Sequence, residues 1–596
     1  MHLLNAPCIR KWPAILTPPA GESLDLILVS GLRGWHGRDN VPHAEGDRGS
    51  AMTGPADIVL RAGSVWTGVV DDPDARAVAV RGGSIVSVGR DEDVQAMSGR
   101  HTRVLDLAGR TVLPGFQDAH VHPPWGGLYA SQCDLHGVDP LQYSSIIRRY
   151  AAEHPDASWV RGGGWSMAAF PGGTPTRQAL DALVPDRPAY LTNRDGHGAW
   201  VNTRAVELAG LTRDTPDTPD GRIEREQDGK PSGTLHEGAM DLVERLLPEP
   251  TPAEWLDAVR RAQTYLHSLG ITAWQDAIVT PETLAAYRTL AERGELTARV
   301  VGALWWDRHR GEEQVEELLE LRTRGTVGRL RCGSVKIMLD GVCENFTASM
   351  LEPYLGDDGR PTGNRGMPML DPSALRRAVV RLDQEGFQVH VHAIGDRAIR
   401  EALDAFEAAR DRSGAGDGRH HIAHIQVVHP QDVPRFAALG VVANAQPFWA
   451  CLEEYQRDLT IPFIGPERSS WQYPFGSLVR SGARLAFGSD WTVSTPNPLL
   501  EMEVAVTRVS PEDRSAEPFL PDERLDLPTA LRAFTAGSAF VNHLDHMTGT
   551  LEPGKVADLV VLDRDLFATD AGPIGDARVL LTMVQGEPVH ADSEFR

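Results

Sequence analysis

The sequence of 596 residues has no apolar run close to the length of a membrane-spanning helix. Such a helix needs about 20 consecutive apolar residues, whereas an early candidate, "LDLILV" at 24–29, is short and contains a carboxylate. The first fifty residues also lack a signal peptide's order of basic end, apolar middle and small-residue cleavage site. We therefore expect neither a membrane protein nor a secreted one.

Cysteine and clustered basic residues are also scarce. The five cysteines are widely spread and form no CxxC pair, so neither a disulfide framework nor a zinc–thiolate site is indicated, and a reducing cytoplasm fits. The formal net charge of -23 at pH 7 would repel a phosphate backbone, and no basic run with interleaved aromatics offsets that field. The sequence predicts a cytoplasmic protein without a nucleic-acid partner.

Both ends of the chain carry short β-rich runs separated by glycine-containing turns. Residues 1–55 show no sustained period and are predicted to form a loose extension, with Met52 as an alternative start to Met1. Beyond them, "ADIVLRAGSVWTG" and "AVAVRGGSIVSVG" have the same texture as the C-terminal "RVLLTMVQGEPVHA". We expect one β-sandwich built from 56–113 and 526–596.

The middle of the chain, 114–525, alternates strand-like and helix-like segments, which predicts βα units around a parallel sheet. One complete βα unit can be identified from the sequence. "GFQVHVHAIGD" alternates valine with histidine, and the following helix repeats Ile399 and Phe406 on one face, with Asp396 placed to cap it. In a (β/α)8 barrel the C-terminal end of a strand lies at the catalytic face, so His392 is expected at the functional rim.

Two histidines one residue apart, His120 and His122, follow a Pro-Gly pair in "PGFQDAHVHP". If this segment is a strand, both side chains point the same way and can reach one cation together. The alternative is two polar residues near a strand end, satisfied by backbone and water.

Further residues of the types that bind metals recur at the ends of predicted strands. Lys336 and Asp340 share one face of "VKIMLDG", and a buried lysine is costly unless it is paired or chemically altered. Three more segments, "VHVHAIGD", "HHIAHIQ" and "AFGSDW", supply His392, His424 and Asp490. His390 shares its face with His392, so geometry alone leaves either one as the ligand.

The spacing between these residues supports an eight-stranded barrel. His392 and His424 are 32 residues apart, close to the roughly 31 expected when about 250 residues are shared among eight βα units. Lys336 lies 56 residues before His392, and Asp490 lies 66 residues after His424, which is consistent with strands four, five, six and eight. From His122 to Lys336 is 214 residues, where three units need only about 93. A long insertion must therefore lie in that interval.

Taken in order, these segments resemble the amidohydrolase superfamily, and within it amidohydrolase family 3 and the branch that includes N-substituted formamide deformylase. The resemblance covers about residue 56 to the end. The matching segments are "PGFQDAHVHP", "DGHGAWVN", "PSGTLHEGAM", "VKIMLDG", "HAIGDRA", "AHIQ", "FGSDW" and "GTLEPGKVADLVVLD". The fold implied is a metal-dependent TIM barrel of the α/β class with a β-sandwich formed by both termini and an inserted cap.

The resemblance also implies two divalent metal ions as cofactors, with zinc expected. One ion would be held by His120, His122 and Asp490, and the second by His392 and His424. Lys336 would bridge them as a carbamate, because uptake of carbon dioxide converts a cation that repels metals into an oxygen-donor anion. If the lysine stays unmodified, a mononuclear site held by the other ligands is the alternative.

The insertion is expected to form a cap at about 125–250 that excludes water and shapes the pocket. It carries Trp165 and His197, which we expect to contact the substrate, with core filling and helix capping as the open alternatives. Asp340 either orients the substrate or binds the following turn. After "LDG" the chain reads "VCENFTASM", where many relatives carry a small-residue and arginine-containing run. This departure concerns substrate recognition rather than the metal.

The predicted function is hydrolysis of a C–N bond other than a peptide bond, in an amide or formamide, through a metal-bridged hydroxide. Metal coordination can bring the pKa of water from about 15.7 to about 7, and Asp490 would accept the proton of the nucleophile and deliver it to the leaving nitrogen. The same ligands also suit cyclic-amide opening, deamination or ester cleavage, and a non-catalytic scaffold is a further alternative. The expected partners are a small-molecule substrate of unread identity and, by default for a soluble enzyme, a second copy in a homodimer.

Overall fold

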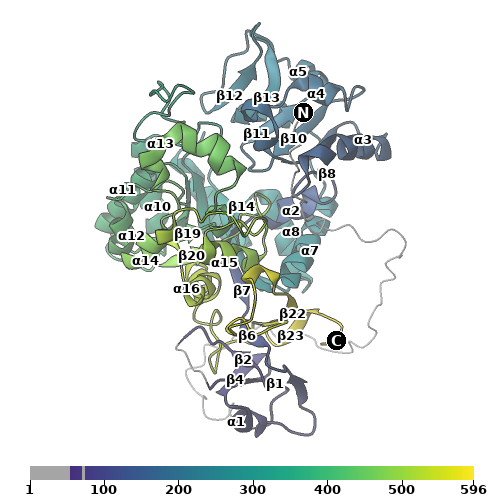
Figure 1. The fold of residues 1–596 in the computed structure, drawn as a ribbon, viewed down its shortest axis with the longest axis vertical. Coiled ribbons are helices and arrows are strands. Elements are labelled where there is room, and N and C mark those ends of the chain that lie inside the picture. Colours follow the sequence, from purple (N-terminus) through teal and green to yellow (C-terminus); the bar gives the residue numbers. More distant parts are fainter. Residues whose placement is uncertain (1–53, 70–73, 596) are drawn as a thin grey trace.

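The computed structural model describes residues 54–69 and 74–595. A barrel occupies the middle of the molecule, a sheet from the first half of the chain lies at one end, and strands from both ends of the chain lie at the other (Figure 1). Apart from Gly54 and Pro55, the predicted extension 1–55 and the alternative start at Met52 lie outside the described residues.

An eight-stranded parallel sheet forms the barrel within the described residues. Its strands are β7 (Phe116–Val121), β14 (Ile271–Val279), β15 (Arg299–Trp305), β16 (Leu330–Met338), β17 (Gln388–Ala393), β18 (His421–His424), β19 (Val442–Ala445) and β20 (Leu485–Phe487). Just beyond β20 the Asp490 N–H donates to the His120 carbonyl at 2.8 Å, and the His122 N–H donates to the Trp491 carbonyl at 2.9 Å. These bonds nearly close the sheet, and the predicted (β/α)8 barrel is confirmed.

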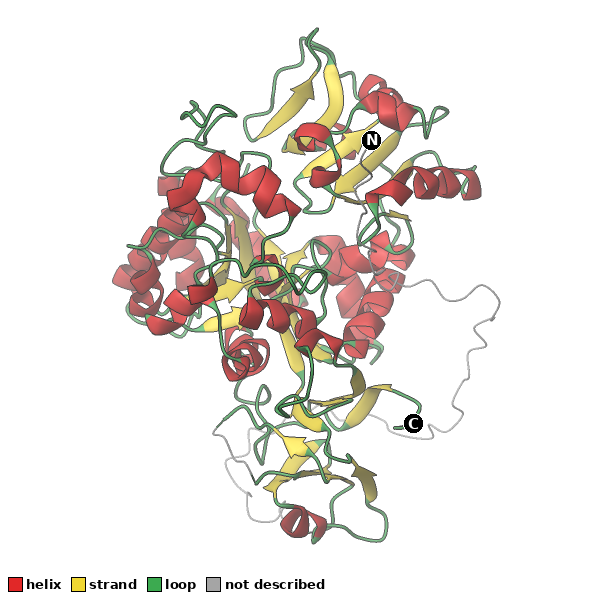
Figure 2. Ribbon diagram, in the orientation of Figure 1, coloured by secondary structure: helices red, strands yellow, loops and turns green. Residues whose placement is uncertain are grey.

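Helices cover the outside of the barrel (Figure 2). They include α7 (Pro252–Ser268), α8 (Pro281–Glu292), α9 (Val315–Arg324), α10 (Pro372–Gln384), α11 (Asp396–Ser413), α12 (Val433–Leu439), α14 (Phe475–Arg480) and α15 (Pro498–Thr507). In the described ranges, no helix combines the length and the apolar character that crossing a membrane requires.

Strand β17 shows how the alternating pattern serves two surfaces. Val389 and Val391 belong to the main apolar core, together with Ile399 of α11. His390 and His392 occupy the alternate positions, which face the barrel interior. The same strand therefore packs a helix on one side and presents imidazoles on the other.

The predicted helix cap at Asp396 is wrong. Gly395 precedes α11, and Asp396 is its first residue. The Asp396 carboxylate accepts a hydrogen bond from the Leu351 N–H at 2.8 Å. The side chain therefore fixes the long loop after β16 instead of the helix end.

A six-stranded sheet lies between β7 and β14 in the sequence, in the order β12-β13-β11-β10-β9-β8. Its strands are β8 (Cys133–Asp134), β9 (Val160–Trp165), β10 (Ala189–Asn193), β11 (Gly198–Val201), β12 (Gly221–Arg225) and β13 (Pro231–Glu237). Helices α3 (Tyr143–Glu153), α4 (Arg177–Asp181), α5 (Thr203–Leu208) and α6 (Asp241–Glu244) accompany it. We call residues 133–244 the cap sheet region; it lies inside the interval of about 125–250 and sits beyond one end of the barrel (Figure 1).

The opposite end of the molecule combines strands from both halves of the chain. One sheet contains β1 (Ile58–Arg61), β3 (Ala77–Arg81), β4 (Ser84–Gly89) and β5 (Arg103–Asp106). The other contains β2 (Ser64–Val65), β6 (Thr111–Pro114), β21 (Leu559–Leu562), β22 (Val579–Val584) and β23 (Glu587–Ala591). Strand β6 pairs antiparallel with β21, which joins the two ends of the chain directly.

Residues just after 525 pack on the barrel. Helices α16 (Leu527–Arg532) and α17 (Ser538–Val541) follow this point, and the Ser538 hydroxyl donates to the Phe487 carbonyl of β20 at 2.9 Å. The predicted β-sandwich includes 526–596, whereas these two helices lie with the barrel strands. Leu531 of α16 belongs to the main apolar core, and Val541 of α17 packs with Ala119 of β7 and Ala486 of β20.

A buried ion pair joins the barrel to the composite sheet. Arg299 of β15 donates from Nε to Asp558 Oδ2 at 2.8 Å and from Nη2 to Oδ1 at 3.3 Å. The Gln585 N–H donates to the same Oδ1 at 2.7 Å, and the Asp558 side chain has 0% exposure. Removing one partner would leave the other charge buried and unpaired.

We expect Asp558→Ala to lower the free energy of unfolding by about 3–5 kcal/mol, measured by chemical denaturation at pH 7. Glu292→Gln is the control, because it removes an exposed pair with Arg288 and should change that free energy by less than about 0.5 kcal/mol. Equal effects of the two substitutions would contradict the role given to the buried pair.

Candidate metal centre

Two histidines and one carboxylate meet where the first and last barrel strands close. His120 lies in β7, His122 directly follows it, and Asp490 follows β20. Asp490 Oδ1 lies 2.9 Å from His122 Nε2 and 3.2 Å from His120 Nε2. One donor atom of each residue lies within 4.8 Å of the others. This spacing allows the three residues to share one metal ion.

A chain of hydrogen bonds sets which nitrogen of His120 carries the proton. The Gln275 amide nitrogen donates to Gln388 and Asn542, so its oxygen accepts from His390 Nδ1 at 2.6 Å. His390 Nε2 then accepts from His120 Nδ1 at 2.8 Å. The lone pair of His120 is thereby left on Nε2, as a metal ligand requires. His390, which the sequence left open as a ligand, lies behind His120.

The protonation states in the cluster suit a metal site. Burial lowers the pKa of His120 and of His424 well below the ordinary histidine value, and nearby cationic groups add to this effect. Burial opposes the charge of Asp490, yet the hydrogen bond from His122 and the charges around it hold its pKa below the ordinary value. Neutral imidazoles and an ionised carboxylate are the forms that bind divalent ions.

Lys336 enters the same space from β16. Its Nζ lies 3.5 Å from His120 Nε2, and the residue is 3% exposed. Burial lowers the pKa of Lys336 to about 7, although Asp490 acts in the opposite direction. At neutral pH, Lys336 is therefore a neutral amine in a substantial fraction of the molecules.

His424 and His392 complete the cluster. Their ring centroids are 4.4 Å apart, and that of His424 is 4.7 Å from that of His120. His424 Nδ1 lies 3.9 Å from Asp490 Oδ2 and, among the described residues, this buried nitrogen has no hydrogen-bond partner. His424 and Asp490 both adopt left-handed backbone, with φ of 77° and 54°. An orphaned donor atom and strained backbone at one place indicate a functional site.

Asp340 contacts the backbone rather than open space. Its carboxylate accepts hydrogen bonds from the N–H groups of Ser349, Ile394 and Gly395 at 2.8–3.0 Å. Oδ1 also lies 3.5 Å from His392 Nε2. Of the two roles left open by the sequence, the structure favours binding of the turn.

Trp165 lies inside the cap sheet region. It is 0% exposed, its indole N–H donates to the Leu191 carbonyl at 2.8 Å, and its ring meets those of Phe170 and Trp200 edge to face. The predicted substrate contact is therefore corrected, because this side chain fills the core of the cap.

His197 reaches the cluster from the cap sheet region. Its ring centroid lies 5.5 Å from that of His392, and its Nδ1 lies 3.0 Å from each carboxylate oxygen of Glu237. Burial opposes a charge on this ring, but Glu237 outweighs burial and raises the pKa of His197 to about 9. A cationic ring next to the cluster is suited to an electron-rich substrate atom.

Three residues near the centre were missed in the sequence: Asp118, Gln275 and Glu237. Asp118 Oδ1 accepts from the N–H groups of His120 and Ser489 at 3.0 and 3.1 Å, and Oδ2 accepts from the Ser489 hydroxyl at 2.6 Å. Asp118 shares its strand face with the two histidines, so the same alternation could have found it. Glu237 lies within the matching segment "PSGTLHEGAM", to which no role was given.

A cleft of about 320 Å³ lies near the His197–Glu237 pair, and none of the candidate metal ligands lines it. Its walls come from the cap sheet region and from the loop after β16, and include Arg222, Glu224, His236, Glu344, Asn345 and Phe346. Asn345 also donates to the Glu237 carboxylate at 3.2 Å. Asn345 therefore connects the wall of the cleft to the His197–Glu237 pair.

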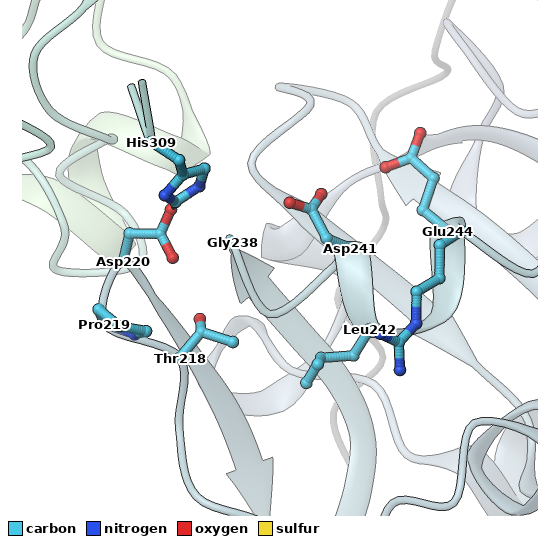
Figure 3. A pocket seen from close by; sticks show the side chains of 9 residues that line it. Thr218, Pro219, Asp220, Gly238, Asp241, Leu242, Glu244 and His309 are labelled. Atoms are coloured by element: carbon cyan, nitrogen blue, oxygen red, sulfur yellow. The ribbon is translucent and has the colours of Figure 1, made fainter. Parts of the chain in front are cut away.

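A second cleft, of about 530 Å³, lies on the cap sheet region beside Asp220, Asp241 and His309 (Figure 3). His309 Nε2 and Asp220 Oδ2 approach to 3.3 Å across it, and Arg308 also pairs with Asp220. None of the candidate metal ligands lines this cleft. It is separate from the centre described above.

The chain is similar in sequence to known proteins over most of its length. The chain is 31% identical over 560 residues to the protein LONG AFTER FAR-RED 3 of Arabidopsis thaliana, covering 90% of this chain and 92% of the relative. It is 29% identical over 568 residues to the N-substituted formamide deformylase of Arthrobacter pascens, covering 90% and 98%.

A solved structure has a similar fold. An uncharacterized metal-dependent hydrolase from Pyrococcus furiosus superimposes with a TM-score of 0.65 at 26% identity, covering 85% of this chain and 99% of the other. The sequence pattern of the amidohydrolase family matches residues 103–590. On these grounds the chain belongs to the amidohydrolase family.

Proposed function

We propose that this protein is a metal-dependent hydrolase that cleaves the C–N bond of an amide or formamide. The observation that carries the proposal is the meeting of six candidate ligands at one mouth of the barrel: His120, His122, Lys336, His392, His424 and Asp490. The deformylase relative supports the formamide bond as the first one to test. A cytoplasmic location, a homodimer and the lack of a nucleic-acid partner stay predictions.

The donor set fits two divalent ions. In this proposal His120, His122 and Asp490 hold one ion, His392 and His424 hold the second, and Lys336 joins them as a carbamate. Imidazole nitrogen and carboxylate oxygen are ligands that zinc accepts, and the orphaned Nδ1 of His424 is an unused donor of this type. Bound divalent ions would lower the pKa of water and polarise a carbonyl group.

Asp490 moves the proton in the proposed reaction. As water adds to the carbonyl carbon, the Asp490 carboxylate accepts a proton from it; the same group then protonates the amide nitrogen while the C–N bond breaks. The products are a carboxylic acid and an amine. His122 lies next to this carboxylate, with Nε2 2.9 Å from Asp490 Oδ1, and belongs to the same proposed ligand set.

We expect the protein to retain about two zinc ions per chain after equilibration and dialysis, and His424→Ala to retain at most about one. The measurement is elemental analysis by mass spectrometry. His267→Gln is the matched control, because this buried histidine already binds the Ile271 carbonyl and the Thr297 hydroxyl, each at 2.8 Å. Equal zinc contents in all three proteins, or none in the wild type, would contradict the assignment.

Asp490→Asn should lower kcat toward N-formyl amines by about 10²- to 10⁴-fold while leaving the melting temperature unchanged. Asp432→Asn removes a buried carboxylate that pairs with Arg400 and Arg435 away from the centre, and should keep wild-type turnover. The same assay should also test N-acyl amino acids and cyclic ureides as substrates. Unchanged turnover by Asp490→Asn would contradict the role of Asp490 in proton transfer. If the wild type hydrolyses only cyclic ureides, the substrate is a cyclic amide and not the proposed open-chain amide.

Lys336 should take up carbon dioxide more readily as the pH rises. With a pKa of about 7, the neutral amine fraction increases roughly tenfold between pH 6 and pH 8. We expect a carbamate carbon signal in ¹³C NMR after incubation with ¹³C-bicarbonate and zinc, stronger at pH 8 than at pH 6. Lys336→Met should abolish it, and a signal that persists in this variant would assign the carbamate elsewhere.

A further inference from the structure

Glu237 is held at the boundary between the cap sheet region and the barrel by an unusual set of contacts. Its carboxylate accepts from the Thr347 hydroxyl at 2.8 Å and from the Asn345 amide at 3.2 Å, and it lies 3.0 Å from His197 Nδ1. Thr347 and Asn345 belong to the segment "VCENFTASM" in the loop after β16. That segment therefore positions a carboxylate of the cap.

The backbone around this carboxylate is adapted to bring it close to the centre. Glu237 has a φ of 53°, a left-handed conformation that a glutamate rarely adopts. At Gly341 a Cβ atom would come within 2.2 Å of Glu237 Oε1, so only glycine permits the approach. Strain and a required glycine at one contact indicate that its geometry serves a function.

The backbone of His197 is fixed at both its N–H and its carbonyl group. Its N–H donates to Asp195 at 2.9 Å, and its carbonyl accepts from Asn345 at 3.3 Å. His197 Nδ1–H donates to the Glu237 carboxylate, and the ion pair with this carboxylate leaves Nε2–H as the ring donor available to a ligand. The side chain is 12% exposed and its ring lies 5.5 Å from that of His392, at the edge of the candidate metal cluster.

We infer that His197 is a catalytic residue that donates a hydrogen bond from Nε2 to the carbonyl oxygen of the scissile amide, and that Glu237 is the positioning residue behind it. This inference rests on the proposed hydrolysis of a C–N bond. The cap thus contributes a chemical group to the reaction, in addition to covering the barrel.

The chemistry of the step is balanced. As water adds, the carbonyl π electrons move to the oxygen, and the growing negative charge strengthens its hydrogen bond with the His197 N–H, which is paired with a buried carboxylate. When the C–N bond breaks, the electron pair returns to the carbonyl and His197 keeps its proton. Asp490 supplies the proton that leaves with the amine.

A set of variants separates catalysis from folding. His197→Asn keeps a donor toward Glu237 but has no group at the place of Nε2, and should lower kcat by about 10²- to 10³-fold. His197→Gln places its amide nitrogen near the position of Nε2 and should retain more activity than His197→Asn. Zinc content and melting temperature should remain those of the wild type in both variants.

Glu237→Gln tests the positioning role through non-additivity. It should lower kcat about tenfold in the wild type but cause no further loss in the His197→Asn background, because a residue that acts through His197 has nothing left to position. Glu226→Gln, a cap carboxylate that pairs with Arg177 away from both clefts, is the control and should leave kcat unchanged. Additive losses from His197→Asn and Glu237→Gln would overturn the pairing.

Binding of methylphosphonate, a small tetrahedral oxyanion, gives a readout that does not depend on amide hydrolysis. Calorimetry on zinc-loaded protein should show binding by the wild type and by Glu226→Gln, and at least about tenfold weaker binding by His197→Asn. If no amide is hydrolysed but this difference holds, the proposed reaction fails while the anion-binding role of His197 stands. Equal affinities, or no binding by the wild type, would overturn the inference.

Discussion

The carboxylate of Asp118 joins the first barrel strand to the segment after the last one. It accepts from the His120 N–H, the Ser489 N–H and the Ser489 hydroxyl, and it is 0% exposed. These bonds involve His120 itself and Ser489, which directly precedes Asp490. The same contacts therefore close the sheet and set the geometry of the candidate metal centre. If the two strands separated, ligands 370 positions apart in the chain would no longer share a metal ion.

Burial gives this closed mouth its chemistry. In a medium of low dielectric the imidazoles of His120, His392 and His424 stay neutral and the lysine amine loses its proton readily, whereas Asp490 keeps its charge because His122 bonds to it. The chain from Gln275 through His390 to His120 adds a tautomeric preference to these protonation states. The barrel interior thus prepares donor atoms before any ion arrives.

Much of this arrangement could be predicted from the sequence, because the relevant signals are local. Alternation placed His120 with His122 on one face, and a spacing of about one βα unit placed His392 and His424 on adjacent strands. The amidohydrolase resemblance supplied the order of the remaining ligands. The core of the cap could not be predicted in this way. Trp165 resembled a rim residue but fills a core, because a single aromatic ring at the end of a short glycine-rich strand leaves no periodic pattern.

The partners of His197 escaped the sequence for a different physical reason. Glu237 and Asn345 are 108 residues apart, and they meet only when the cap sheet packs against the loop after β16. No local pattern encodes such a contact. Asp396 shows the same limit on a smaller scale, because its carboxylate bonds a neighbouring loop in preference to its own helix.

The most direct test of the account is the anomalous diffraction of crystals grown with zinc, recorded at the zinc absorption edge. The account predicts two peaks at the barrel mouth, one beside His120, His122 and Asp490 and one beside His392 and His424, with ligand distances of about 2.0–2.2 Å. Peaks confined to the cap or the surface, with none among these side chains, would contradict it.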